Sequence, residues 1–185
     1  MDNKNKHICP VEMAGMLDGR IRRWLQNPYK ILEPYIKKGM TVMDFGCGPG
    51  FFSIPMAQMV GASGRVIAAD LQEGMLQKLE DKIQGTRLYD RILLHKCEKN
   101  SIGLSQQVDF ILAFYMIHEL PDQKKFFDEI KSILKPNGRV FIVEPIFHVS
   151  KKTFEQTVKI AIATGFTPVE KPKVLFSKAV ILENS

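Results

Sequence analysis

Three glycines that follow an acidic residue form the segment whose residue types and spacing most clearly indicate chemistry. Gly46, Gly48 and Gly50 lie just after Asp44, which comes at the end of the short, mostly apolar run 41–43. Glycine tolerates positive φ and lets a ligand lie against bare backbone. A glycine turn between a buried strand and a helix therefore predicts a pocket for a nucleotide-like ligand.

The spacing of these glycines separates the turn from two other nucleotide-binding loops. A dinucleotide fingerprint has the pattern G-x-G-x-x-G, but Phe51 stands where its third glycine would be. A phosphate-binding P-loop needs a lysine and then a Ser or Thr after its last glycine, and the segment 46–52 contains no lysine. The turn matches neither pattern.

A second acidic residue extends the predicted pocket. Asp70 ends another short apolar run, 65–69, and lies 20 residues after Gly50. A carboxylate at the end of such a strand can accept hydrogen bonds from both hydroxyls of a ribose. NAD-dependent enzymes use the same device, so Asp70 predicts a ribose without identifying the ligand, and its alternative role is that of a helix cap.

Four blocks of sequence, in the family's order, resemble the class I S-adenosylmethionine (SAM)-dependent methyltransferases. The first is the acid-x-Gly-x-Gly-x-Gly turn, and the second is the strand that ends at Asp70, followed by Leu71. The third block, 108–121, resembles the family's fourth strand and the loop beyond it. The fourth, 134–144, is similar to the L-K-P-G-G turn before the fifth strand, with Asn137 for the first glycine. Asparagine also tolerates the left-handed conformation that this turn needs.

The elements that must position these residues indicate an α/β fold. Strands that alternate with helices favour a parallel sheet covered on both faces. The segments 166–170 and 173–182 lie so close together that they predict a hairpin. This ending resembles the Rossmann-like, doubly wound methyltransferase sheet of seven strands, with implied order 3-2-1-4-5-7-6 and strand 7 antiparallel. The ligand is then expected at the carboxyl ends of the strands, beside the switch point between strands 1 and 4.

The chain of 185 residues is expected to form a single domain. Residues 1–36 are interpreted as an N-terminal helical cover, with 1–10 disordered, ahead of a SAM-binding core over 37–185. Helices are predicted over 51–60, 72–84, 122–134 and 151–164. Several apolar residues of the cover could form a flap over the pocket or simply pack on the core; they are Met13, Met16, Leu17, Trp24 and Leu25.

The resemblance implies a site for SAM, and for its product S-adenosylhomocysteine (SAH), at the glycine turn. The methionine half would lie against the turn, and amides of the following helix would bind its carboxylate. Asp44 would hold the amino group directly or through water, Asp70 the ribose, and Leu71 and Met75 the adenine. The SAM-binding residues expected in full are Asp44, Phe45, Gly46, Cys47, Gly48, Gly50, Asp70, Leu71, Met75, Cys97, Glu98 and Phe114.

One block departs from the family pattern. Many methyltransferases carry Gly-Asp-Ala after the third strand, where the Asp accepts a hydrogen bond from adenine N6. Lys96 stands near that position here. The adenine edge is therefore expected to meet either the backbone of Cys97 or the residue Glu98, unless both residues are merely close to the site. Cys47 is interpreted as a small residue of the pocket wall and not as a nucleophile.

The catalytic residues are less strongly indicated than the donor site. Methyl transfer from a sulfonium is an in-line displacement, so positioning supplies most of the catalysis. A general base is needed only when the acceptor must lose a proton. His118, whose ordinary pKa is about 6.5, and Tyr115 are the candidate catalytic residues, and each has a structural role as its alternative. Glu144 and His148 are weaker candidates.

Composition limits the partners of the chain. The formal net charge of +6 permits a nucleic-acid partner, although no basic cluster interleaved with aromatic residues supports one. His7 and Cys9 lack the further ligands that zinc requires, so no metal is expected. Three scattered cysteines favour a reducing compartment. With no apolar run of membrane-span length and no signal-peptide pattern, we expect a cytoplasmic location.

The predicted function is methyl transfer from SAM to a small-molecule acceptor. The core carries no long insertion of the kind that often recognises substrates in this family. The chain is similar to the small-molecule methyltransferases of the ubiquinone and menaquinone biosynthesis type. Two alternatives stay open, an NAD-dependent oxidoreductase and a SAM-binding protein without catalytic activity. The oligomeric state and the acceptor atom (O, N, C or S) are left undetermined.

Overall fold

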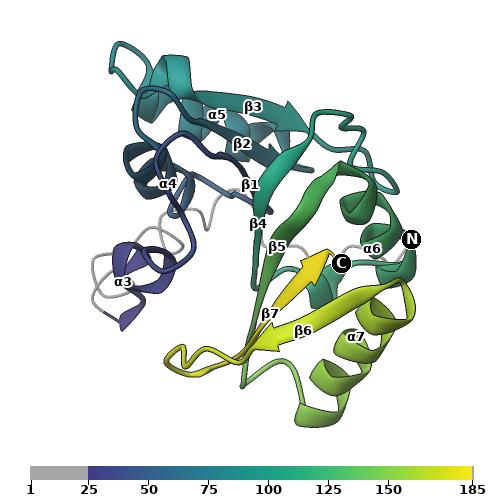
Figure 1. Ribbon diagram of the computed structural model, residues 1–185. Helices are drawn as coiled ribbons and strands as arrows, with labels where there is room; N and C mark the ends of the chain where they lie inside the picture. The colour runs from purple at the N-terminus through teal and green to yellow at the C-terminus, as the bar shows by residue number, and fades with distance from the viewer. Residues whose placement is uncertain (1–24, 185) are drawn as a thin grey trace.

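The computed structural model describes residues 25–184 of the chain. These residues form a seven-stranded sheet with helices on both faces (Figure 1). The expected disordered segment, most of the helical cover and four of the five flap residues, together with His7 and Cys9, lie outside the described residues. The division of the chain at residue 36 stays a prediction.

The strand order is β3-β2-β1-β4-β5-β7-β6. The strands are β1 (Thr41–Phe45), β2 (Arg65–Asp70), β3 (Ile92–Lys96), β4 (Val108–Phe114), β5 (Leu134–Pro145), β6 (Phe166–Glu170) and β7 (Ser177–Asn184). The first five strands are parallel, whereas β7 is antiparallel to both β5 and β6. The predicted order and the antiparallel seventh strand are confirmed.

The four predicted helices are confirmed, each one or two residues shorter than expected. The helices are α3 (Pro28–Leu32), α4 (Ser53–Val60), α5 (Glu73–Ile83), α6 (Gln123–Ile133) and α7 (Lys151–Ala163), with 3-10 turns η3 (Tyr89–Arg91) and η4 (Ile117–Glu119). The shortening arises because the predicted ranges included capping residues. Asp122, for example, lies outside α6, where its side chain accepts a hydrogen bond from the amide of Lys125.

The last strand begins later than predicted. The range 173–182 was expected, whereas β7 runs over Ser177–Asn184. Phe176 has a φ of 54°, a left-handed conformation that interrupts an extended strand. The amide of Ser177 donates to the carbonyl of Val174, which closes a turn. Residues 171–176 therefore belong to the β6–β7 connection.

The turn before β5 has the expected chemistry. Asn137 adopts a φ of 61°. Leu134 already pairs with Val108, so β5 begins before this turn, and the pairing shifts register between Val108 and Phe110. The left-handed asparagine thus lies at an irregularity inside a long strand.

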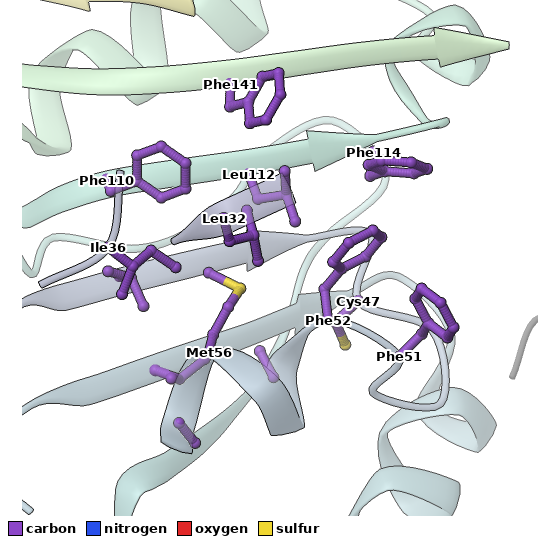
Figure 2. Packing of buried hydrophobic residues seen from close by; sticks show 14 of the residues in the cluster. Leu32, Ile36, Cys47, Phe51, Phe52, Met56, Phe110, Leu112, Phe114 and Phe141 are labelled. Carbon is purple, nitrogen blue, oxygen red and sulfur yellow. The ribbon is translucent and has the colours of Figure 1, made fainter. Parts of the chain in front are cut away.

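The sheet separates two hydrophobic clusters. Figure 2 shows the first, in which Leu32 of α3 and Met56 of α4 pack against the face of the sheet that carries Phe110. The second lies on the other face, under α6 and α7, and includes Phe127 and Ile130. Burial of both faces matches the near-continuous apolar runs of the central strands. Three buried acidic residues lie at or near the carboxyl ends of the strands, namely Asp44, Asp70 and Glu144. Within residues 25–184, no helix is both long and apolar enough to cross a bilayer.

Candidate active site

The glycine turn lies between β1 and α4, and its three glycines all have positive φ. The φ angles of Gly46, Gly48 and Gly50 are 75°, 52° and 87°. The amides of Gly46 and Cys47 both donate to the carbonyl of Ala69, at 2.8 and 3.0 Å. These bonds fix the turn against the end of β2. A Cβ added at Gly46 would come within 3.1 Å of the Met116 side chain. The turn therefore leaves bare backbone where a side chain would not fit.

We expect Gly50→Ala to lower the free energy of unfolding by about 2–4 kcal/mol. The added Cβ would overlap the side chain of Leu79 in α5 and would also hold alanine at a left-handed φ. Urea unfolding followed by circular dichroism measures the loss.

Gly85→Ala is the matched control for this prediction. Gly85 has a φ of 73° and no atom within 4 Å of an added Cβ, so only the conformational cost of about 1–2 kcal/mol applies. In a Leu79→Ala background, the Gly50→Ala penalty should fall to the Gly85 value. Equal losses for Gly50→Ala and Gly85→Ala in the wild-type background would contradict the close packing of Gly50 on Leu79.

Asp44 lies buried directly beneath the turn. Its carboxylate accepts a hydrogen bond from the hydroxyl of Ser53, at 2.5 Å, and Ser53 is the first residue of α4. Both side chains are buried. Sequence reasoning missed Ser53, although a serine in the first turn of the helix after the glycines was a usable signal. The bond fixes one carboxylate oxygen and ties the end of β1 to the start of the helix.

Asp70 joins the end of β2 to the glycine turn. One oxygen of its carboxylate accepts from the amide of Gly48 and the other from the amide of Gln72, each at 2.9 Å. Burial raises the pKa of this carboxyl above its ordinary value, and the amide bonds oppose the rise. Each carboxylate oxygen has a second lone pair. Asp70 can therefore still accept hydrogen bonds from a ribose.

The remaining predicted residues near β2 and β3 differ in accessibility. Leu71 is partly exposed, whereas Met75 is buried. The amide of Cys97 donates to the carbonyl of Asp70 at 2.9 Å. Glu98 and Ser101 exchange backbone hydrogen bonds of 3.0 and 3.3 Å, which closes a turn. The amides of Cys97 and Glu98 thus already have partners within the protein.

The predicted residues at the ends of β1 and β4 lie on opposite faces of the sheet. Phe45 packs on Phe126 of α6, with ring centroids 4.8 Å apart. Phe114 packs on Phe52 (Figure 2), and their ring centroids are 4.4 Å apart. Cys47 is buried, and burial raises the pKa of its thiol well above the ordinary value. A thiol held protonated in this way fits a wall residue better than a nucleophile.

A cavity of about 300 Å³ opens beside the 98–101 turn. Its lining includes Glu98, Ile102, Leu120 and Phe126, together with Phe45 at the carboxyl end of β1. Two predicted SAM-binding residues, Phe45 and Glu98, therefore share this cavity, which sequence reasoning did not anticipate.

His118, just beyond β4, and Glu144, near the end of β5, form a hydrogen-bonded pair. The Nδ1 atom of His118 lies 2.5 Å from Oε2 of Glu144, and the His118 amide donates to Oε1 at 3.2 Å. Glu144 is buried, while 24% of the His118 side chain is exposed. The hydrogen bond to Glu144 raises the pKa of His118. Glu144 thereby fixes the orientation of the imidazole, and no residue within 25–184 bonds its other nitrogen.

Two further titratable groups lie near this pair. Burial raises the pKa of Glu119 to about 7, with the nearby His118 opposing the rise. The ring of His148 stacks on that of His118, with centroids 6.5 Å apart and planes 8° apart. The structure therefore brings the candidate His118 together with the weaker candidates Glu144 and His148.

The hydroxyl of Tyr115 is held by two separate segments of the chain. Tyr115 has a φ of 61°, which is unusual for an aromatic residue. Its hydroxyl lies 2.6 Å from the hydroxyl of Ser177 and accepts from the side-chain amide of Gln26 at 2.5 Å. This arrangement favours the structural alternative for Tyr115 over a catalytic one. In the part of the chain that the structure describes, no group of three or more His, Cys, Asp or Glu side chains could hold a metal ion.

Comparison with known proteins gives consistent matches. Residues 36–172 match the model of a family described as "Methyltransferase domain". The demethylmenaquinone methyltransferase of Lactobacillus johnsonii is 32% identical over 122 residues, which cover 65% of this chain and 49% of that protein. The enzyme of the same name from Geobacillus sp. is 27% identical, with coverage of 66% and 51%. The chain thus spans about half the length of the curated relatives it matches.

Two solved structures match this chain over nearly their whole length, unlike the curated relatives. A SAM-dependent methyltransferase from Aquifex aeolicus superposes with a TM-score of 0.85 at 28% identity, over 96% of this chain and 100% of that one. A methyltransferase from Pyrococcus furiosus gives a TM-score of 0.70 at 16% identity, over 94% and 98% of the two chains. The second match shows the shared fold alone.

Proposed function

Because this chain belongs to the class I SAM-dependent methyltransferases, we propose that it transfers a methyl group from SAM to a small-molecule acceptor. Membership rests on the family match over residues 36–172. One observation carries the proposed activity, the presence of a donor cradle and a hydrogen-bonded base at the same edge of the sheet. Asp44 is the last residue but one of β1, Asp70 is the last residue of β2, and His118 follows β4.

The residues of the cradle fit the two polar ends of SAM. Asp44 is proposed to bind the amino group, and the amides at the start of α4 the carboxylate. Asp70 is proposed to accept from the ribose hydroxyls, since its two oxygens keep accepting capacity beside the amides of Gly48, Gln72 and Leu71. Leu71 supplies an exposed apolar surface for the adenine. When bound, SAM supplies a methyl group on a positively charged sulfur, ready for displacement.

His118 is proposed to remove a proton from the acceptor as the methyl group is transferred. The imidazole keeps one nitrogen for this task because the Nδ1 atom is bonded to Glu144. The buried Glu144 carboxylate stabilises the imidazolium that forms. Such a base suits an acceptor that reacts through an O–H, N–H or acidic C–H group. A tertiary amine or a thioether would need no base.

The names of the curated relatives support a small acceptor. Those relatives are called demethylmenaquinone methyltransferases, a name that describes an enzyme acting on a small molecule. The chain covers about half of their length. We therefore propose the class of acceptor from this similarity, and a screen of candidate acceptors with labelled SAM would identify the compound. A cytoplasmic location also stays a prediction.

We expect SAH, and not NADH, to bind the chain in isothermal titration calorimetry. The glycine turn lacks the third glycine of the dinucleotide fingerprint, and the sheet ends in an antiparallel pair. Saturable SAH binding with no heat from NADH is the expected result. Binding of NADH without SAH would favour the oxidoreductase alternative. Binding of SAH without methylation of any screened acceptor would favour the catalytically silent alternative.

A further inference from the structure

Four apolar side chains are exposed together where two loops meet at the carboxyl end of β5. Ile146 and Phe147 precede α7, and Leu175 and Phe176 end the β6–β7 connection. Their exposed fractions are 41%, 78%, 49% and 51% in the same order. We call these four residues the apolar tip. Large apolar side chains scattered singly on a surface are ordinary, whereas a contiguous group marks an interaction site.

Contacts between the two loops make the tip a single surface. The amide of Ile146 donates to the carbonyl of Phe176 at 3.1 Å. The rings of Phe147 and Phe176 have centroids 6.0 Å apart. Pro145 of β5 also pairs with Ser177 of β7, directly behind the tip. Figure 1 shows the β6–β7 connection extending outward beyond the body of the sheet, near the bottom of the view.

The backbone at Phe176 is strained in a way that favours a use for its side chain. Its φ of 54° is a conformation that glycine or asparagine adopts far more readily than phenylalanine. Such strain costs of the order of 1–3 kcal/mol and is typical of functional positions. The strained residue therefore presents an aromatic ring, half exposed, next to the ring of Phe147.

Three exposed lysines lie in, or directly after, the two loops that form the apolar tip. Lys171 and Lys173 lie in the same connection as Leu175 and Phe176, and Lys152 lies in the first turn of α7. Within residues 25–184, none of these three lysines forms an ion pair with a carboxylate. The nearby Glu170 accepts a hydrogen bond from the Tyr35 hydroxyl and pairs with none of these lysines. The loops of the tip therefore carry lysines whose charge no ion pair within 25–184 neutralises.

We propose that the apolar tip and its three lysines dock this protein on an anionic phospholipid surface. Aromatic and aliphatic side chains enter the interface between headgroups and acyl chains, and lysines are attracted to anionic headgroups. A second copy of the chain fits less well, because a symmetric contact would bring the same lysines together. Charge complementarity thus selects the lipid surface as the occupant.

Docking in this way would place the lipid beside the proposed acceptor site. Glu144, which holds His118, immediately precedes Pro145 and the tip. Ser177 follows Phe176 and bonds Tyr115. An acceptor dissolved in the bilayer would therefore approach the base without first crossing water. The docking itself does not depend on methyl transfer.

Sedimentation with vesicles tests the proposal. We expect the protein to bind phosphatidylcholine vesicles that contain phosphatidylglycerol, and to bind pure phosphatidylcholine vesicles much more weakly. Lys171→Ala and Lys173→Ala should each lower the partition coefficient on the anionic vesicles about fivefold. Phe147→Ser should lower it at least about tenfold. High salt should weaken binding of the wild type to these vesicles.

Ile162→Ser is the matched control, because Ile162 is also an exposed apolar residue but lies near the far end of α7. Its partition coefficient should equal that of the wild type. SAH calorimetry on every variant checks that the fold and the donor site are intact. Equal binding by the tip variants and the wild type would overturn the proposal. Tip-dependent dimers in analytical ultracentrifugation, without vesicle binding, would also overturn it and identify a second copy as the occupant.

Discussion

Replacing Asp70 with alanine is expected to weaken SAH binding by about 10²–10⁴-fold, since the two hydrogen bonds that the ribose hydroxyls donate to a charged acceptor are lost. The carboxylate stands between the glycine turn and α5, with one oxygen bonded to each side. A ribose that adds its two hydroxyls to these oxygens completes a buried network. Isothermal titration calorimetry of SAH against the wild type and Asp70→Ala measures the change.

The loss of the amide bonds in Asp70→Ala could also disturb the turn, so the ligand is varied as well as the protein. SAH that lacks the ribose 2′-hydroxyl should bind more weakly than SAH to the wild type. In Asp70→Ala, removing the 2′-hydroxyl from SAH should leave the affinity almost unchanged, because the carboxylate that would accept its hydrogen bond is already absent. An equal loss in both proteins would contradict the ribose role. Asp90→Ala, at an exposed position in η3, serves as the surface control.

Replacing His118 with alanine is expected to lower turnover by about 10²–10⁴-fold, the range typical of a lost general base. SAH affinity should change little, because the proposed donor contacts lie on β1, β2 and the glycine turn. Steady-state kinetics with the acceptor found in the screen measures turnover, and calorimetry measures SAH affinity. A parallel loss of both would instead show that His118 holds the site together.

Glu144→Gln tests the pair through its pH dependence. A base works only when deprotonated, so activity rises with pH through the pKa of His118. The Glu144 carboxylate raises that pKa, so its removal should move the rising limb of kcat/KM to lower pH while lowering the maximum. Glu119, whose pKa is about 7, titrates in the same range. The Glu119→Gln variant therefore shows how much Glu119 contributes to the pH profile. If Glu144→Gln left the rising limb of the profile at the same pH, the pairing of His118 with Glu144 would be contradicted.

The fold was predictable because the sequence marks the ends of its strands. Asp44 and Asp70 stop two apolar runs, and the short spacing between the last two strands requires a hairpin. The boundary of the last strand was wrong because Phe176 adopts a left-handed φ that nothing in its residue type indicates. The predicted helices were one or two residues too long because a periodic pattern does not distinguish a capping residue from a helical one.

The pairs within the site were harder to predict than its individual residues. His118 and Glu144 lie 26 residues apart, and each appeared in the sequence as a separate candidate. Their contact arises because β4 and β5 are parallel neighbours, with Phe114 opposite Val143. The expected strand order could have revealed it, since residues at the carboxyl ends of two adjacent parallel strands must lie close together. No such rule brings Gln26 to Tyr115.

Met75 illustrates a different limit. It lies in the first turn of α5, where the resemblance places it beside the adenine, yet its side chain is buried. Leu76 and Leu79 of the same helix are also buried. A short apolar cluster in a helix does not reveal which of its members face a ligand and which face the sheet.

The strand order β3-β2-β1-β4-β5-β7-β6 has a consequence for how such a protein can change over generations. Nearly all of the proposed donor contacts lie before residue 100, whereas His118, Glu144 and the β6–β7 connection come later in the chain. Mutations that reshape the later half can therefore accumulate while the earlier half is kept under purifying selection. Two duplicated genes could diverge in the molecules they methylate and still draw on one common methyl donor.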